Sequence, residues 1–212
     1  MRIISYSIDD PTYRVFSNSF YNNITIRASD FGHTEFINGA TQIILPTAEH
    51  CFALIKANHI KCLPMFINVL SSDTFQKAKK VSNVFNSFEP TNEINEWNDY
   101  KFLETMIIIY CLKCRQTPEF KNKLYGTRGY CLVQTTGDLF WSCGLRNIPD
   151  EVDEETPYRG KNVAGYILMK IRNILFNFEI LILKSSNKEA PFIYSKVDQI
   201  FSSNGGFRHI LE

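Results

Sequence analysis

The segment PTAEHCFALIK, Pro46–Lys56, marks the point at which the sequence changes from short strands to helices. Thr47 is a residue type that often caps a helix N-terminus, and Glu49 would fall in the first turn, where the helix dipole favours an acid. From Ala48 to Asn58 the apolar residues recur at the spacing of one helix face. These features predict a helix over Ala48–Asn58.

Glu49 and Lys56 are seven residues apart, so on a helix they share one face, with Phe52 between them. An acid and an amine beside an aromatic ring are a workable site for chemistry on a ribose. The alternative is a surface acid and a surface base on either side of a core phenylalanine. Spacing alone leaves both interpretations open.

The stretches on either side of this helix predict the rest of the fold. Alternating or β-branched residues between turn formers predict strands at Arg2–Ser7, Tyr13–Phe16, Asn23–Arg27, Thr41–Leu45 and Tyr130–Thr135. Helical periodicity predicts further helices at about Asp73–Val81, Trp97–Arg115, Pro118–Gly126 and Lys161–Phe178. The sequence therefore predicts an α+β, mainly helical fold, with one domain over residues 1–183 and a polar C-terminal tail over residues 184–212.

Composition limits the class of protein. The chain has 212 residues and a formal net charge of +1, which argues against binding nucleic acid through bulk positive charge. The six cysteines lack the spacing of a disulfide framework, which indicates a reducing, cytoplasmic location. The longest apolar stretches, Met106–Leu112 and Ile174–Leu183, are shorter than the roughly 20 residues that span a bilayer, so no membrane partner is expected.

Two further clusters carry candidate chemistry. Asp138 and Trp141, near a predicted strand end, could hydrogen-bond and stack a flat base, or they could be a turn former and a core ring. Lys161 and Asn162 stand at the start of a predicted helix, where backbone N–H groups and a lysine could bind phosphate. An ordinary helix start is the alternative. The Asp150–Thr156 segment is expected to be an acidic, solvated loop.

Metal binding and cofactors are not expected. Cys111 and Cys114 have the spacing of a metal-binding pair, but no second pair of ligands stands at a zinc-like distance, and both lie in an apolar helical run. The sequence therefore predicts neither a metal nor a cofactor.

The order of these motifs resembles the YbiA-like, or NADAR, family. The family pattern FSNF…PTSEHxFQxxK is similar to Phe16-Ser17-Asn18 with Phe20, followed by Pro46–His50, Phe52 and Lys56. The pattern W…M…K…Q…EL…L…T is similar to Trp97, Met106, Lys113, Gln116, Glu119, Leu124 and Thr127. The pattern LV…D…W…GKN…G…LM…R is similar to Leu132-Val133, Asp138, Trp141, Gly160-Lys161-Asn162, Gly165, Leu168-Met169 and Arg172. The resemblance extends over about residues 13–175.

The resemblance implies an N-glycosidase that cleaves the bond between a ribose phosphate and an exocyclic amine. Known members act on the phosphoribosylamino-pyrimidine intermediates of riboflavin synthesis, and others remove ADP-ribose from guanine in nucleic acid. The small phosphoribosylamine is the substrate we expect, since the net charge and the acidic loop offer little to a nucleic-acid backbone. A non-catalytic reader of ADP-ribose or NAD is the alternative of another class, but binding alone would not require Glu49 and Lys56.

The resemblance also implies roles for individual residues. The catalytic set is Glu49, Lys56 and Asp138, and the substrate-binding set is Phe16, Asn18, His50, Trp97, Trp141, Lys161 and Asn162. Two routes remain open: Glu49 activates a water that attacks the ribose C1, or Lys56 attacks the ring-opened C1 as a Schiff base. Ala53 and Ser142 stand where the family usually has Gln and Gly, which leaves the substrate preference open.

Overall fold

The structure, a computed structural model, describes residues 2–84, 92–97, 101–146 and 159–184. These residues form two compact units. We call residues 2–17 and 117–184 the terminal unit and residues 18–116 the central unit. The predicted acidic loop Asp150–Thr156 lies outside the described residues, and so does the predicted tail beyond its first residue.

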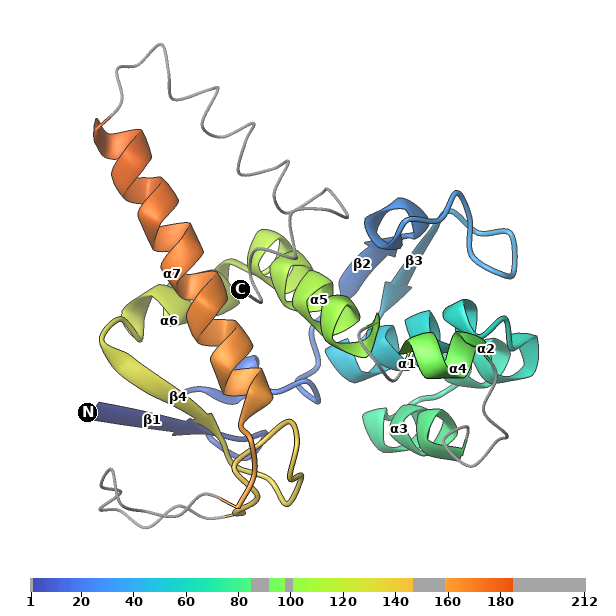
Figure 1. Cartoon of the computed structure of the whole chain (residues 1–212), viewed down its shortest axis with the longest axis horizontal. Helices are drawn as coiled ribbons and strands as arrows, with labels where there is room; N and C mark the ends of the chain where they lie inside the picture. Colours follow the sequence, from blue (N-terminus) through green and yellow to red (C-terminus); the bar gives the residue numbers. More distant parts are fainter. Residues whose placement is uncertain (1, 85–91, 98–100, 147–158, 185–212) are drawn as a thin grey trace. The chain divides into compact units, whose positions relative to one another are not determined.

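The central unit is built around one helix. Its elements are β2 Ile24–Arg27, the 3-10 helix Ala28–Phe31, β3 Gln42–Leu45, α1 Ala48–His59, α2 Leu63–Leu70, α3 Phe75–Val84, α4 Asn92–Glu96 and α5 Phe102–Gln116 (Figure 1). Helix α1 packs against α2, α3 and α5 and also touches both strands. Because α1 is surrounded in this way, most of its side chains are buried, including charged ones.

Strands β2 and β3 form an antiparallel pair, with Ile24 opposite Leu45 and Arg27 opposite Gln42. Ile24 and Ile26 are fully buried, whereas Arg27 is exposed, as the two-residue period of a half-buried strand requires. This ribbon leads directly into α1. Thr47 lies between them in an extended conformation, and its hydroxyl accepts a hydrogen bond from the backbone N–H of His50. Such a cap contributes about 1 kcal/mol to helix stability.

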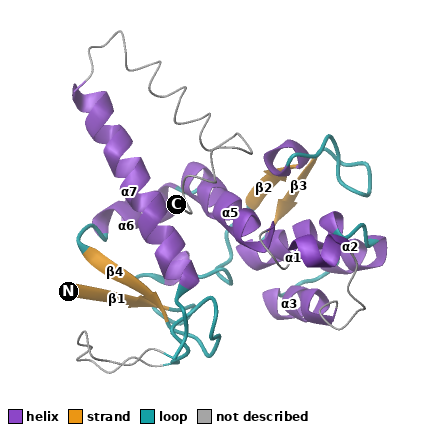
Figure 2. Ribbon diagram, in the orientation of Figure 1, coloured by secondary structure: helices purple, strands orange, loops and turns teal. Residues whose placement is uncertain are grey.

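The terminal unit pairs the first strand of the chain with a strand that follows the central unit in the sequence. Its elements are β1 Arg2–Tyr6, the 3-10 helix Arg14–Phe16, α6 Pro118–Gly126, β4 Tyr130–Gln134 and α7 Val163–Lys184 (Figure 2). Strands β1 and β4 are parallel, with Arg2 opposite Tyr130, and α7 packs on β4. A side chain on Gly165 would collide with the Leu132 carbonyl oxygen, so glycine is what permits α7 to approach β4 so closely.

The predicted α+β, mainly helical class is confirmed, with three corrections in detail. Tyr13–Phe16 was expected to be a strand but contains a 3-10 helix, because Asp10 accepts hydrogen bonds from the N–H groups of Thr12 and Tyr13 and turns the chain. Helix α2 was not predicted. The helix expected from Trp97 begins at Phe102, and Trp97 stands before it. Within the described residues, no helix combines the length and the apolar character that a bilayer crossing needs.

Candidate functional site

The predicted site residues divide equally between the two units. The central unit holds Asn18, Glu49, His50, Lys56 and Trp97, and the terminal unit holds Phe16, Asp138, Trp141, Lys161 and Asn162.

Glu49 and Asn18 come together in the central unit, although 31 positions separate them in the sequence. The backbone N–H of Glu49 donates to the carbonyl oxygen of Asn18 at 3.1 Å. Asn18 is 93% buried, and its side chain lies near the phenol of Tyr110, on α5. Burial, opposed by the neighbouring Asn18 amide, raises the pKa of Tyr110, and the nearby Glu49 carboxylate raises it further. Asn18, Tyr110 and the half-buried acid Glu49 thus form one polar cluster.

The sequence motifs do not single out Tyr110. It lies within the apolar run Met106–Leu112, where the pattern predicts an ordinary core residue. The signal that could have revealed it is the hydroxyl group, because a buried phenol requires a polar partner.

Lys56 is almost completely buried on α1. Its side chain is 6% exposed, and its Nζ donates to the carbonyl oxygen of Ser82 on α3 at 3.2 Å. Burial lowers the pKa of Lys56, because the ammonium form loses hydration in this position. A larger fraction of neutral amine at physiological pH is the property that a lysine nucleophile needs.

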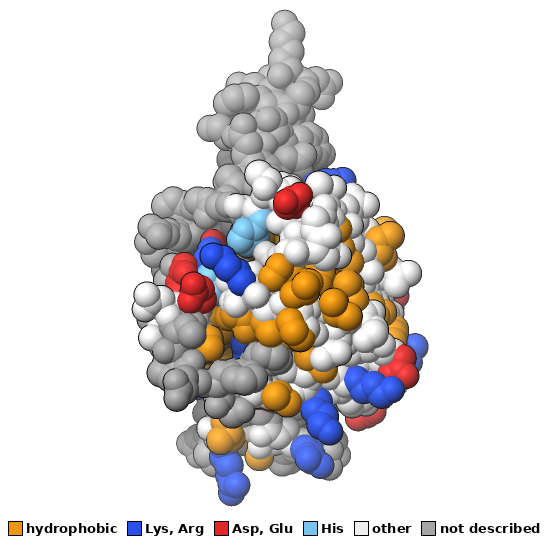
Figure 3. All heavy atoms as spheres, turned by 90° about the vertical axis from the view of Figure 1, so that its right-hand side faces the viewer, with side chains coloured by type: hydrophobic (Ala, Val, Ile, Leu, Met, Phe, Trp, Pro, Cys, Tyr) orange, Lys and Arg blue, Asp and Glu red, His pale blue; other side chains and the backbone are white. Residues whose placement is uncertain are grey.

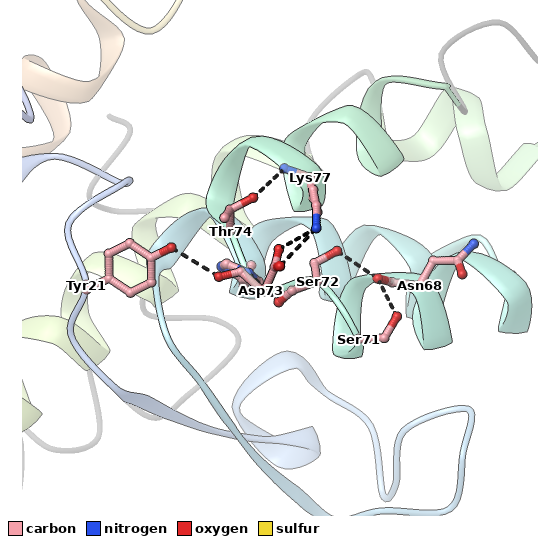
Figure 4. Close-up of polar contacts among 8 residues, drawn as sticks. Tyr21, Asn68, Ser71, Ser72, Asp73, Thr74 and Lys77 are labelled. Atoms are coloured by element: carbon pink, nitrogen blue, oxygen red, sulfur yellow. Dashed lines mark hydrogen bonds and ion pairs between the residues drawn. The ribbon is translucent and has the colours of Figure 1, made fainter.

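His50 links the start of α1 to the turn between α2 and α3. Its Nδ1 lies 2.7 Å from the Thr47 hydroxyl, and its Nε2 lies 3.2 Å from the carbonyl oxygen of Ser72. That turn is further held by the ion pair of Lys77 with Asp73 and by Tyr21, whose hydroxyl donates to the Asp73 carbonyl (Figure 4). His50 is fully buried, so the role that the structure shows is positioning of the Glu49 turn, and its contact with substrate stays a prediction.

Trp97 packs on α1 against two half-buried rings of that helix. Its ring meets the Phe52 ring at 5.3 Å between centroids with an interplanar angle of 65°, and it meets the His59 ring at 5.8 Å. Trp97 is only 3% exposed, and it lines a cavity of the central unit together with His59. Its contact with substrate stays a prediction.

Asp138 shapes a turn in the terminal unit. Its Oδ1 accepts hydrogen bonds from the backbone N–H groups of Phe140 at 2.9 Å and of Trp141 at 2.8 Å. This arrangement holds Trp141 half-buried, with its ring 5.2 Å from that of Phe140. The Nζ of Lys161 lies 5.5 Å from the Phe140 centroid. Trp141 and Lys161 therefore both lie beside the Phe140 ring, and Asp138 holds the turn that carries Trp141.

Asn162 and Phe16 have packing roles in the terminal unit. Asn162 adopts a left-handed conformation (φ 51°), and its amide donates to the Leu132 carbonyl at 2.8 Å and accepts from the Gln134 N–H at 3.0 Å. It therefore joins the start of α7 to β4. Phe16 is fully buried between the rings of Tyr6 and Phe120. Substrate contact by either residue stays a prediction.

In the described part of the chain, no three His, Cys, Asp or Glu side chains gather closely enough to hold a metal ion.

Lys113 is completely buried on α5. Burial lowers the pKa of Lys113 to about 7, although the nearby thiols of Cys114 and Cys51 oppose that shift.

The chain matches known proteins in sequence and in fold. The sequence profile of the NADAR domain family matches residues 6–176. N-glycosidase R617 of Acanthamoeba polyphaga mimivirus is 28% identical over 144 residues, which cover 65% of this chain and 79% of that protein. The NMR structure of the Escherichia coli protein YbiA superimposes with a TM-score of 0.60 at 22% identity, covering 88% of this chain and 90% of that one.

Proposed function

The chain belongs to the NADAR domain family and is an N-glycosidase, and we propose that the bond it hydrolyses joins a ribose phosphate to an exocyclic amine. The observation that carries this proposal is the pairing on α1 of a half-buried acid, Glu49, with a buried lysine of lowered pKa, Lys56. A binding protein would have no need of a buried amine with a lowered pKa on the same helix as a half-buried carboxylate.

The chemistry starts with the substrate itself. The lone pair of an exocyclic glycosylamine nitrogen can open the ribose ring to an iminium ion, while the ring oxygen leaves C1 and is protonated. C1 is then electrophilic, and the reaction requires no strong leaving group. This property suits a site of one amine and one carboxylate.

Lys56 is the proposed nucleophile. Its neutral Nζ adds to the electrophilic C1, a proton passes from Nζ to the substrate nitrogen, and the C1–N bond breaks to release the free amine. C1 remains joined to Lys56 as an imine. The buried surroundings of Lys56 support this role, because they disfavour the ammonium form that cannot attack.

Glu49 is the proposed base for the second half of the reaction. It takes a proton from the water that adds to the imine carbon, and the collapse of that adduct returns the lysine amine and the sugar aldehyde. The hydrogen bond from its backbone to Asn18, and the cap at Thr47, hold its turn of α1 in position.

Residues of the terminal unit have proposed binding roles. Within this unit, Trp141 would stack on a flat ring, and Asp138, besides its turn hydrogen bonds, would accept a hydrogen bond from the amide edge of such a ring. Lys161 would supply a positive charge for the phosphate, and Asn162 would fix the backbone at the start of α7.

The proposed substrate is a free phosphoribosylamino-pyrimidine of the riboflavin pathway type. The near-neutral net charge supports a small metabolite over nucleic acid, because each phosphate contact normally recruits a lysine or arginine. The test compares kcat/KM for such a pyrimidine and for an oligonucleotide carrying ADP-ribosylated guanine. Preference for the pyrimidine is expected. Preference for the guanine adduct, falling steeply with added salt, would contradict the substrate while leaving the N-glycosidase assignment intact.

A further inference from the structure

The interior of the central unit contains a tyrosine that the reaction above does not use. On the face of the molecule shown in Figure 3, charged side chains lie at the surface between apolar ones. The phenol of Tyr110, on α5, is by contrast completely buried. Taking a hydroxyl group out of water is unfavourable unless a polar neighbour replaces the lost hydrogen bonds. The groups beside this hydroxyl therefore decide what Tyr110 contributes.

The face of α5 that carries Tyr110 packs against α1. Tyr110 and Lys113 are three residues apart on α5, so they share one face of the helix. Both are fully buried, and the amine of Lys113 lies near the thiol of Cys51, a residue of α1. The phenol of Tyr110 lies near the carboxylate of Glu49, which precedes Cys51 by two residues. Both contacts place this face of α5 beside the first turns of α1.

Asn18 connects the phenol to the turn that carries Glu49. The backbone carbonyl oxygen of Asn18 accepts the hydrogen bond from the Glu49 N–H at 3.1 Å, and its side chain lies near the Tyr110 hydroxyl. Asn18 is 7% exposed, and its Oδ1 is buried without a hydrogen-bond partner among the described residues. An amide oxygen only accepts hydrogen bonds, whereas a phenol O–H donates one. The two side chains are therefore complementary.

The chemistry of the phenol suits orientation better than proton transfer. Burial raises the pKa of Tyr110, and the Glu49 carboxylate adds to this effect, although the Asn18 amide opposes it. The hydroxyl therefore keeps its proton at physiological pH and remains a donor. A neutral phenol can hold the Asn18 side chain without adding a second negative charge beside the proposed base.

We propose that Tyr110 is a positioning residue for the hydrolysis: its hydroxyl donates to Oδ1 of Asn18 during the reaction, and Asn18 holds the backbone of the turn that carries Glu49. The assignment rests on the proposed function for the role of Glu49 as the base. Hydrogen bonds in active sites often tighten only when substrate binds. A base must stay within hydrogen-bond reach of the water that it activates, so a looser Glu49 turn slows the second half of the reaction.

The test measures hydrolysis of the phosphoribosylamino-pyrimidine by the full chain and by Tyr110→Phe, which removes the hydroxyl and keeps the ring. One lost hydrogen bond should lower kcat by about 3- to 10-fold. Because Glu49 acts after the C1–N bond has broken, kcat/KM, which reports the earlier steps, should change little. In the Glu49→Gln background the same change should have no further effect, because no base is left to position. Tyr125→Phe, which removes a half-buried hydroxyl from α6, is the matched control and should leave kcat unchanged.

Thermal unfolding shows whether each variant is folded, and Tyr110→Met is the second variant should Tyr110→Phe not fold. Three results would overturn the positioning role: equal kcat for the wild type and the folded variant, an equal loss of kcat and kcat/KM, or the same loss of kcat in both backgrounds. Unfolding of both variants would assign the phenol to stability and overturn it as well. Absence of hydrolysis by the wild type would reject the proposed function and this role with it. Hydrolysis that depends on Glu49 but not on Tyr110 would reject the positioning role alone.

Discussion

The backbone N–H of Glu49 and the carbonyl oxygen of Asn18 are 3.1 Å apart, so the first turn of α1 is tied to a segment that precedes β2. This bond brings together two residues that the sequence motifs single out separately. It also fixes the backbone of the helix turn that carries the Glu49 carboxylate, and this carboxylate lies near the Tyr110 phenol.

Glu49→Gln should preserve the fold and reduce turnover by about 10²–10⁴-fold, the usual effect of losing a general base. The two side chains are nearly isosteric, and the backbone bond to Asn18 is retained. Steady-state kinetics at matched thermal stability measures the effect. Glu35→Gln, an exposed acid in the same unit, is the control and should be fully active. Equal turnover by the wild type and Glu49→Gln would remove Glu49 from the mechanism.

The pH dependence of kcat/KM should report the titration of Lys56. Only the neutral amine attacks C1, so the rate rises with pH as Lys56 loses its proton. Because burial lowers the pKa of Lys56, this rise should occur below the ordinary lysine value of about 10.4. Lys56→Arg keeps the positive charge and should abolish the rise along with the activity. A rise centred at the ordinary lysine value would show that burial does not tune this residue.

Acid should destabilise the protein through its buried histidines. Burial lowers the pKa values of His33, His50 and His59. Below about pH 6.5 the unfolded chain therefore binds more protons than the folded one, and the free energy of unfolding falls as the pH drops from 7 towards 5. Urea denaturation at both pH values measures this loss. The double variant His33→Gln/His59→Gln should lose less stability, and an identical loss would point to other groups.

Lys113→Met should stabilise the protein at neutral pH. Complete burial lowers the pKa of Lys113 to about 7, whereas the unfolded value is about 10.4. Between these values the unfolded chain binds the extra proton, so wild-type stability rises with pH from about 7 to 10. Replacing the amine with an apolar side chain of similar length removes the cost of burying this ammonium, so the gain in stability should be larger at pH 7 than at pH 10. Denaturant unfolding of both proteins at pH 7 and pH 10 tests this, and a large loss of stability in Lys113→Met would show that the amine has an essential partner.

The helix that carries Glu49 and Lys56 could be predicted because its signals are local. Thr47, the acid in the first turn and the apolar spacing all lie within Pro46–His59, and α1 begins at Ala48, as predicted. Helix α2 lacks such signals. Cys62 precedes it without capping through its side chain, and Leu63, Ile67 and Leu70 are exposed, so its apolar run has no polar face to reveal a helical period.

The candidate site could be predicted only in part, for a related reason. Glu49, Lys56 and Asn18 stand in motifs whose order is visible in the sequence. The surroundings of Tyr110 and His59 depend on residues that are distant in the sequence and are brought close by packing. These neighbours are Asn18 for Tyr110 and Trp97 for His59. Conversely, the burial of Phe16 and the backbone hydrogen bonds of Asn162 show that a motif residue can serve packing.

The most direct test of the proposed mechanism is a borohydride trap during turnover of the phosphoribosylamino-pyrimidine. Reduction of the C1 imine should leave a sugar-phosphate adduct on Lys56, identified by peptide mass spectrometry and absent from Lys56→Arg. Product formation at the wild-type rate with Lys56 unmodified, or an active Lys56→Arg variant, would contradict covalent attack by this lysine.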